Sequence, residues 1–372
     1  MHEEAIIVFS HLRWSFVYQR PQQLLARMAE RRRVIFFEEP VLDPEVAPFL
    51  ECSNPAQGVM VCRPHTPVQR PGYHDEQISC LVPLLEELLR EERLERYLAW
   101  FYTPMALPLA APLKPRLVVY DCMDELSGFL DAPKELAERE RALLKWADLV
   151  FTGGPSLYRA KQRHHARVYC FPSSVDAAHF GLACDPTIEH ENQRPLPRPR
   201  LGYFGVLDER LNLPLLDALA TSHTEWQIVM VGPVLKIAPE TLPQRENISY
   251  YGQQQYAELP RFVAGWDVCL IPFALNDATR FISPTKILEY MAAEKPVVST
   301  PITDVAEPYG DIVFIGDDIA SFIAGCEGAL ALPRAKQREM VQAMRAVVAG
   351  TSWDGTVRAM EELLTATWPP IR

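Results

Sequence analysis

A lysine and a glutamate in the last third of the chain have the spacing that best fits a ligand site. Lys286 and Glu289 lie on one face of a predicted helix, because residues three apart in a helix are neighbours. Ser283 is a favourable N-cap, and Pro284 suits the first helical position, where its missing N–H costs nothing. The free N–H groups of this turn, which includes Thr285, suit a phosphate, and Glu289 suits a diol. The alternative is a solvated ion pair worth roughly 0.2–0.5 kcal/mol.

Four further residues of the second half follow predicted strands and are candidates for binding the same ligand. Gly205 ends the first of these strands, where a glycine lets the backbone approach a ligand, and the cation Arg210 follows it. Lys236 and Gly252 follow the next two predicted strands. A tight turn at the glycines and a solvated loop at Lys236 explain these residues equally well.

Aromatic and basic residues follow the first predicted strand and are candidates for binding an acceptor. His11, Arg13, Trp14 and Arg20 all lie within this segment. Trp14 suits stacking on a sugar face, and Arg13 suits an acceptor phosphate. The alternative is a hydrophobic staple flanked by solvated arginines.

Carboxylates follow the predicted strand 117–120 and are candidates for acid–base chemistry. Asp121 and Asp124 are suited to orienting or deprotonating an acceptor hydroxyl, although loop carboxylates also commonly cap helices. No D-x-D motif stands in a suitable strand–loop context, so we expect no metal and no cofactor. None of the eight cysteines forms a C-x-x-C pair, and reduced thiols are expected.

Two similar series of elements are predicted to position these residues. Continuous apolar strands alternate with amphipathic helices in both halves, which indicates an α/β fold with parallel sheets covered on both faces. The prolines among charged residues at 186–200 predict a linker. The expected parts are a first Rossmann-like domain, the linker, a second Rossmann-like domain and a C-terminal helix, at 1–185, 186–200, 201–350 and 351–372.

Composition places the chain among globular proteins of ordinary content, with 48% apolar and 23% charged residues in 372. The net charge of −11 argues against nucleic-acid binding. The acidic start does not resemble a secretory signal, and a cytoplasmic location is expected. Two basic clusters, Arg27 to Arg33 and Lys161 to Arg167, fit either solvated helix ends or peripheral contact with the inner face of a membrane.

The segment 283–298 reads S-P-x-K-x-x-E-Y-x-A-x-x-K-P-V-V and resembles the donor-site signature of GT-B glycosyltransferases, especially retaining enzymes of the family-four type. The resemblance implies two Rossmann-like domains facing a cleft, an acceptor-binding domain at 1–185 and a donor-binding domain at 201–350. It also implies that the C-terminal helix crosses back to the first domain and that Glu289 binds the nucleotide ribose. It also implies that Lys286, Arg210 and the helix N-terminus hold the diphosphate without a metal, and that the anomeric configuration is retained. Phe281 and Glu294 depart from the family pattern, which has a second glutamate and a glycine at these places.

The segment 11–23 resembles glycosyltransferases of the teichuronic-acid and surface-polysaccharide type. The expected function is transfer of a sugar from a UDP- or GDP-sugar to a hydroxyl of a saccharide or lipid-linked acceptor, with Asp121, Asp124 and Lys286 as catalytic residues. A nucleotide-sugar epimerase of the same architecture and a non-catalytic sugar-nucleotide-binding subunit remain alternatives.

Overall fold

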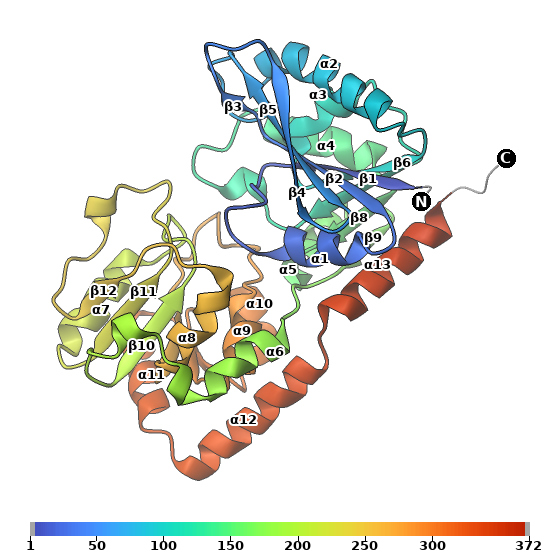
Figure 1. Ribbon diagram of the computed structural model, residues 1–372. Helices are drawn as coiled ribbons and strands as arrows, with labels where there is room; N and C mark the ends of the chain where they lie inside the picture. The colour runs from blue at the N-terminus through green and yellow to red at the C-terminus, as the bar shows by residue number, and fades with distance from the viewer. Residues whose placement is uncertain (1–3, 369–372) are drawn as a thin grey trace. The chain divides into compact units, whose positions relative to one another are not determined.

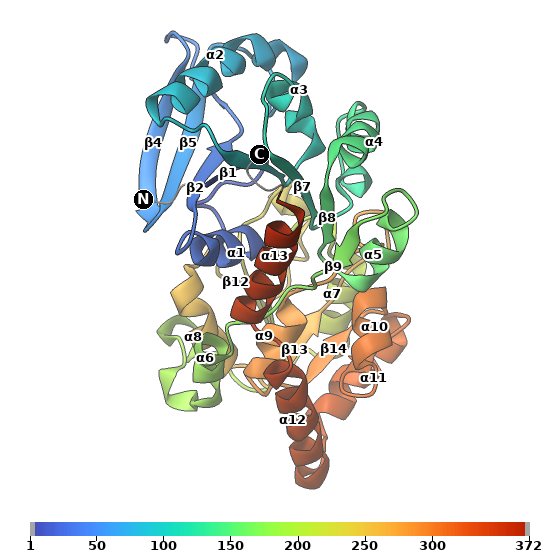
Figure 2. The same ribbon diagram turned by 90° about the vertical axis from the view of Figure 1, so that its right-hand side faces the viewer.

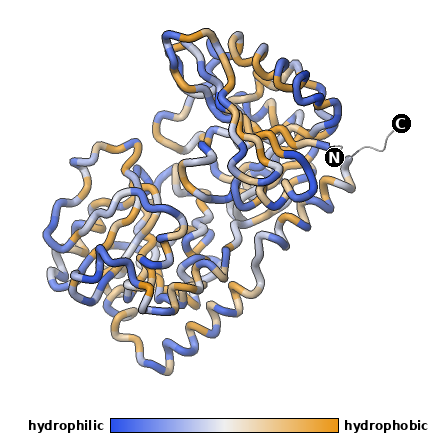
Figure 3. The backbone as a smooth tube through the Cα atoms, in the orientation of Figure 1, coloured by the Kyte–Doolittle hydropathy of each residue, from blue (hydrophilic) through white to orange (hydrophobic). Residues whose placement is uncertain are grey.

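A computed structural model describes residues 4–368 and divides them into two compact units (Figure 1). The N-terminal unit comprises the chain up to Ser127, Asp131–Pro172 and the chain from Asp354. The C-terminal unit comprises Gly128–Leu130 and Ser173–Trp353. Apolar segments run through the strands of each unit, and the hydrophilic segments lie mainly in helices and loops (Figure 3).

The N-terminal unit is built on a nine-stranded sheet, mostly parallel, whose order is β3-β5-β2-β1-β6-β7-β8-β9 with β4 paired to β5. Helices α2, α3 and α4 lie on one side of this sheet, and α1 and α13 lie on the other (Figure 1). The strands are β1 Ala5–Ser10, β2 Arg33–Glu38, β3 Val41–Leu42, β4 Phe49–Ala56, β5 Val59–Thr66, β6 Tyr97–Phe101, β7 Leu117–Cys122, β8 Leu149–Thr152 and β9 Val168–Cys170. The helices are α1 Arg20–Met28, α2 Asp75–Glu91, α3 Leu107–Ala110, α4 Leu136–Trp146, α5 Pro155–Lys161 and α13 Trp353–Thr367.

The C-terminal unit is built on a six-stranded parallel sheet with the order β12-β11-β10-β13-β14-β15. Its strands are β10 Arg200–Phe204, β11 Gln227–Val231, β12 Ile248–Tyr250, β13 Val268–Ile271, β14 Val297–Ser299 and β15 Phe314–Ile315. Its helices are α6 Ala177–Gly181, α7 Leu213–Ser222, α8 Leu259–Ala264, α9 Lys286–Ala292, α10 Thr303–Tyr309, α11 Ile319–Leu330 and α12 Arg334–Ala349. The predicted α/β class with parallel sheets is confirmed.

The strand order of the C-terminal unit sets where a ligand can bind. From β10 the chain moves outward to β11 and β12, and then returns to β13 on the other side of β10. Right-handed crossovers on the two sides place their helices on opposite faces of the sheet. The carboxyl ends of β10 and β13 are therefore the switch point at which such sheets bind ligands.

The helix α13 is grouped with the N-terminal unit from Asp354 onward. It lies beside α1 in both ribbon views (Figure 2). The Arg27 guanidinium is 2.6 Å from the Asp354 carboxylate, and Arg32 is 2.9 Å from Glu361. These ion pairs help to fix the last helix on the first one.

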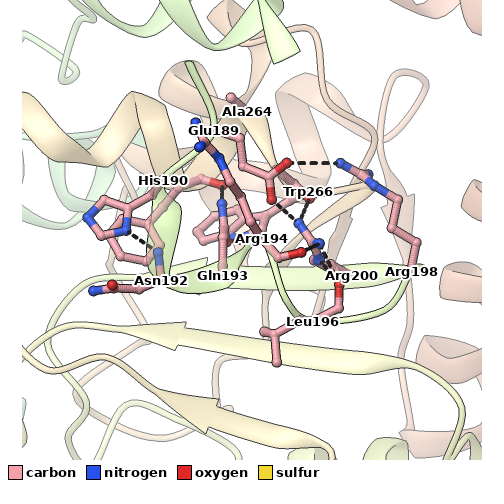
Figure 4. Close-up of polar contacts among 12 residues, drawn as sticks. Glu189, His190, Asn192, Gln193, Arg194, Leu196, Arg198, Arg200, Ala264 and Trp266 are labelled. Carbon is pink, nitrogen blue, oxygen red and sulfur yellow. Dashed lines mark hydrogen bonds and ion pairs between the residues drawn. The ribbon is translucent and has the colours of Figure 1, made fainter. Parts of the chain in front are cut away.

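The segment 186–200 is not a linker, contrary to the prediction, because it packs on the C-terminal unit (Figure 4). The buried Arg200 donates to the Leu196 and Arg194 carbonyls and pairs with Glu189. The fully buried Gln193 donates to the Phe262 carbonyl at 2.8 Å and accepts from the indole of Trp266 at 3.1 Å. The boundary between units lies at Pro172, earlier than the predicted residue 185.

Candidate functional site

The helix α9 is held on the end of β10 by its apolar face and by one tyrosine. Ile287, Leu288 and Met291 are buried, as the sequence pattern predicts. The hydroxyl of the fully buried Tyr290 accepts a hydrogen bond from the Phe204 N–H at 3.2 Å. The first residues of α9 are thereby fixed at the carboxyl end of β10, which is the switch point of the sheet.

Lys286 lies against the glycine that ends β10. Its ammonium is 5.5 Å from the ring centroid of Tyr203, a cation–π contact that the sequence did not predict. Gly205 has φ +140°, and a Cβ there would lie 2.8 Å from the Lys286 Nζ. The N–H of Gly205 donates to the Val231 carbonyl at 2.8 Å. A side chain at Gly205 would displace the Lys286 side chain. The position of the Lys286 ammonium at the end of β10 therefore depends on the glycine.

The carboxyl of Glu289 is held in an environment that favours its neutral form. Although part of the residue is exposed, the carboxyl is surrounded by protein atoms. Burial raises its pKa from 4.5 to about 7, and the neighbouring charge of Lys286 acts in the opposite direction. Among the described residues 4–368, no side chain or backbone group donates a hydrogen bond to this carboxylate. Its acceptor capacity is therefore available to a ligand.

The predicted cap of this helix is wrong. The helix begins at Lys286, and Thr285 precedes it in the αR conformation with no side-chain cap hydrogen bond. Ser283 and the buried Pro284 belong to the turn before α9, where the Ile287 N–H donates to the Pro284 carbonyl at 3.2 Å. A capping side chain needs an extended backbone, which Thr285 does not have. The phosphate-binding role of these three residues stays a prediction.

The two other predicted cations of this unit are paired within the unit. Arg210 makes a bidentate contact with Asp208, with Nε 2.9 Å from Oδ1 and Nη2 2.6 Å from Oδ2. Lys236, at φ +61°, is 3.5 Å from Glu209. Both cations lie over the ring of Phe129, at 5.8 Å for Arg210 and 4.6 Å for Lys236. The two carboxylates partly neutralise the charges of Arg210 and Lys236. The sequence analysis predicted no acidic partner for either cation.

The remaining predicted donor residue and the departures from the family pattern also have definite positions. Gly252 follows β12 at φ +63°, and its carbonyl accepts from the Gly232 N–H at 2.7 Å. Phe281 lies under the Arg280 guanidinium, 5.2 Å from its Cζ. Glu294 directly follows the residue after α9 at φ +56°, and its carboxylate is 2.6 Å from the Arg345 Nε.

In the N-terminal unit, Asp121 and Arg20 form a buried ion pair. Asp121 is fully buried, and Arg20 is 3% exposed. The guanidinium contacts both carboxylate oxygens, with its Nη2 2.8 Å from Oδ1, and Nη1 donates to the Phe171 carbonyl at 2.7 Å. An acid–base residue must reach substrate. The geometry gives Asp121 and Arg20 a structural role that joins β7 to α1, and their predicted catalytic and acceptor roles stay predictions.

The loop after β1 is fixed on β2. Arg13 is 3.1 Å from the fully buried Glu38 and donates to the Pro40 carbonyl at 3.2 Å. The Trp14 N–H donates to Glu38 at 2.8 Å, and its ring meets Phe36 edge-on at 5.1 Å. Arg13 and Trp14 are thus engaged in packing, and their acceptor roles stay predictions, as does that of the half-buried His11.

Two carboxylates of the N-terminal unit remain partly exposed at strand ends. Asp124 lies in the loop after β7. Glu39, which the sequence analysis missed, follows β2, and burial raises its pKa to about 7, against the opposing charge of Arg13. A general base works best with a pKa near the working pH. Glu38 and Glu39 directly follow the apolar residues of β2, and this pair was the signal in the sequence that could have identified Glu39 as a candidate.

The basic clusters are largely neutralised within their own unit. Arg27 and Arg32 pair as described above, and Arg33 pairs with Glu92. The buried Lys161 is 2.7 Å from Glu125 and 2.6 Å from Glu140. These pairs do not support membrane contact. Within residues 4–368, no helix is long and apolar enough to cross a membrane, and no three metal-ligating side chains are grouped.

Comparison with known proteins finds similarity to glycosyltransferases in part of the sequence and in the fold. Residues 198–349 match the family described as glycosyl transferases group 1. The chain is 24% identical over 274 residues to the teichuronic acid biosynthesis glycosyltransferase TuaH of Bacillus subtilis (strain 168), covering 67% of this chain and 68% of that protein.

Solved structures resemble the chain over nearly its whole length. A sucrose-phosphate synthase from Thermosynechococcus elongatus has a TM-score of 0.70 at 15% identity and 98% coverage of both chains. An E. coli trehalose-6-phosphate structure bound with UDP-2-fluoro glucose has a TM-score of 0.70 at 12% identity and 99% coverage of both chains. At these identities the likeness establishes the shared fold.

Proposed function

We propose that this chain is a glycosyltransferase of the GT-B fold and that it transfers a sugar from a UDP- or GDP-sugar to a hydroxyl acceptor. The resemblance in the segment 283–298 suggested a family of this kind, and the match of residues 198–349 to glycosyl transferases group 1 and the similarity to TuaH support it. The observation that carries the donor assignment is the arrangement of Gly205, Lys286 and Glu289 at the switch point of the C-terminal sheet.

Each of these residues has a chemical task in the proposed donor site. The Lys286 ammonium, held over Tyr203 and against Gly205, attracts the negatively charged diphosphate. The Glu289 carboxylate, which no protein donor in residues 4–368 meets, accepts hydrogen bonds from the two ribose hydroxyls. A diphosphate also displaces Asp208 from Arg210, which adds a bidentate donor at the cost of breaking that pair.

The reaction places new negative charge on the departing nucleoside diphosphate. Lys286 stabilises that charge from a fixed position, which is the kind of interaction that lowers a reaction barrier most. We propose that this cation makes the transfer independent of a metal ion, and that the anomeric configuration is retained. Activity in the presence of EDTA tests the first point, and the anomeric coupling constant of the product tests the second.

The acceptor side is proposed to use a carboxylate of the N-terminal unit. Asp124 and Glu39 are the better candidates, since the charge of Asp121 is neutralised by Arg20. The relative from Bacillus subtilis is named for teichuronic acid biosynthesis. A saccharide or lipid-linked acceptor of a bacterial surface polysaccharide is therefore the proposed acceptor class.

The test is a set of single-turnover assays with UDP- and GDP-sugars, with and without an added acceptor. Transfer to the acceptor supports the proposal. Conversion of the donor alone would indicate an epimerase, and binding without turnover would indicate a non-catalytic subunit.

A matched pair of lysine variants tests the site itself. Lys286→Gln should weaken UDP binding by roughly 10-fold or more, because a charged contact to a phosphate contributes about 1.5–3 kcal/mol. Lys236→Gln is the control, because that lysine is 45% exposed and already paired with Glu209. Calorimetry with UDP measures both. Equal effects of the two substitutions would contradict the special role of Lys286.

A further inference from the structure

Two cysteines face each other across the β4–β5 hairpin of the N-terminal unit. Cys52 in β4 and Cys62 in β5 are directly opposite in the antiparallel register. Both are free thiols, and their Sγ atoms lie 3.5 Å apart. Directly opposed residues have Cα atoms about 4.5–5.5 Å apart, and disulfides join Cα atoms about 4.4–6.8 Å apart. The backbone therefore already holds both residues at a separation that a disulfide accepts.

The two thiols have different environments. Cys52 is exposed, and Cys62 is buried. The hydrogen bond between the two sulfur atoms lowers the pKa of Cys52 to about 7, against burial and the charges of Glu92, Glu91 and Glu51. The same hydrogen bond, together with burial, raises the pKa of Cys62. The exposed Cys52 is thus the more acidic of the two thiols, and the buried Cys62 is its protonated neighbour.

The hairpin also has the freedom that bond formation requires. The register of β4 against β5 shifts between Ser53 and Ala56, directly after Cys52. Most of β4 is exposed, and within residues 4–368 this strand pairs only with β5. A small movement of such an edge strand disturbs little packing, so the sulfur atoms can approach from 3.5 Å to bonding distance.

We propose that Cys52 and Cys62 are a modification site, a reversible redox pair that a small-molecule disulfide such as oxidised glutathione converts to an intramolecular disulfide. The Cys52 thiolate attacks one sulfur of the oxidant, which forms a mixed disulfide and releases one glutathione thiolate. The Cys62 thiol then loses its proton to solvent and attacks the Cys52 sulfur, which releases the second glutathione. Two protein thiols have lost two electrons, and one oxidant disulfide has become two thiols.

The modification would act next to a contact that holds the loop after β1. Arg63 directly follows Cys62 and donates to Glu38 at 2.8 Å. Glu38 in turn accepts from the Trp14 N–H at 2.8 Å. A disulfide at Cys62 therefore fixes the strand that carries Arg63, and hydrogen exchange in β4 and β5 should become slower.

The experiment uses the full chain in glutathione buffers of increasing oxidised fraction, followed by alkylation and mass spectrometry. Cys52 and Cys62 should lose alkylation together and before the other six cysteines, with loss of two hydrogen atoms, and dithiothreitol should restore both thiols. Alkylation of both cysteines throughout the series would overturn the proposal. A stable glutathione adduct on Cys52, without the intramolecular bond, would overturn it too.

Two serine variants complete the test without disturbing a buried position. Cys52→Ser removes an exposed sulfur, so this variant should fold, and its Cys62 should stay alkylatable after denaturation. Cys184→Ser removes an exposed cysteine of the C-terminal unit and should leave the oxidation of the pair unchanged. Oxidation of Cys62 with another cysteine in the Cys52→Ser protein would contradict the assignment of the pair.

Discussion

Replacing Glu289 by glutamine should stabilise the free protein and lower its affinity for the nucleotide of the donor. Burial raises the pKa of this carboxyl from 4.5 to about 7 in the folded protein. Between these two pH values the folded state binds more protons than the unfolded state, so the free energy of unfolding falls as pH rises. The two pKa values differ by about 2.5, and each unit corresponds to about 1.36 kcal/mol. Above pH 7 the free energy of unfolding is therefore lower by about 3 kcal/mol than at a pH where the carboxyl is protonated in both states. Because the residue is partly exposed, solvent screening reduces this to about 1–3 kcal/mol.

The Glu289→Gln variant keeps the size of the side chain and removes this pH-dependent cost. At about pH 8.5 its Tm should exceed that of the original protein by about 2–12 °C, and at about pH 4 the two should agree. UDP affinity, measured by calorimetry, should fall about 10- to 100-fold through loss of charged hydrogen bonds. In the original protein, that affinity should rise with pH through about 7, because the ionised carboxylate is the better acceptor.

Two results would refute this reasoning separately. A Tm difference that is the same at both pH values would mean that the Glu289 carboxyl is well solvated in the free protein. Unchanged UDP affinity in Glu289→Gln would remove the residue from ribose binding, whatever its pKa. Lys286→Gln distinguishes these cases, because it should weaken UDP binding without removing the pH dependence of stability.

Two further substitutions test the remaining contacts. Asp121→Asn should lower the free energy of unfolding by about 3–5 kcal/mol in urea, because it leaves the buried Arg20 without its counter-charge; normal stability with lost turnover would instead restore the catalytic role. Gly205→Ala should weaken UDP binding by roughly 10-fold, since φ +140° strains the alanine and its methyl group displaces Lys286. Gly252→Ala also has a positive φ but meets nothing within 4 Å, so a comparable loss there would argue against the Lys286 contact.

The sheet of the C-terminal unit could be predicted well because buried parallel strands are continuous apolar runs. The largely apolar segments 227–231, 268–271 and 297–299 each predict a buried strand, and they match β11, β13 and β14 at both ends. Strand β4, at Phe49–Ala56, was missed because its residues are mostly exposed and it includes Asn54 and Pro55. It is a strand because β5 supplies its hydrogen-bond partners, and local sequence does not encode that pairing.

The sequence by itself determined the alternation of buried strands and helices in both halves and placed Lys286 and Glu289 on a short helix after a strand of a doubly wound sheet. The tertiary structure alone decided which charged residues are available to a ligand. Arg20 and Asp121 are 101 positions apart and neutralise each other, while the Glu289 carboxyl has no donor in residues 4–368. Spacing along the chain fixes only local neighbours. The role of a charge depends on its burial and on partners brought from distant segments, and these exist only in the folded chain.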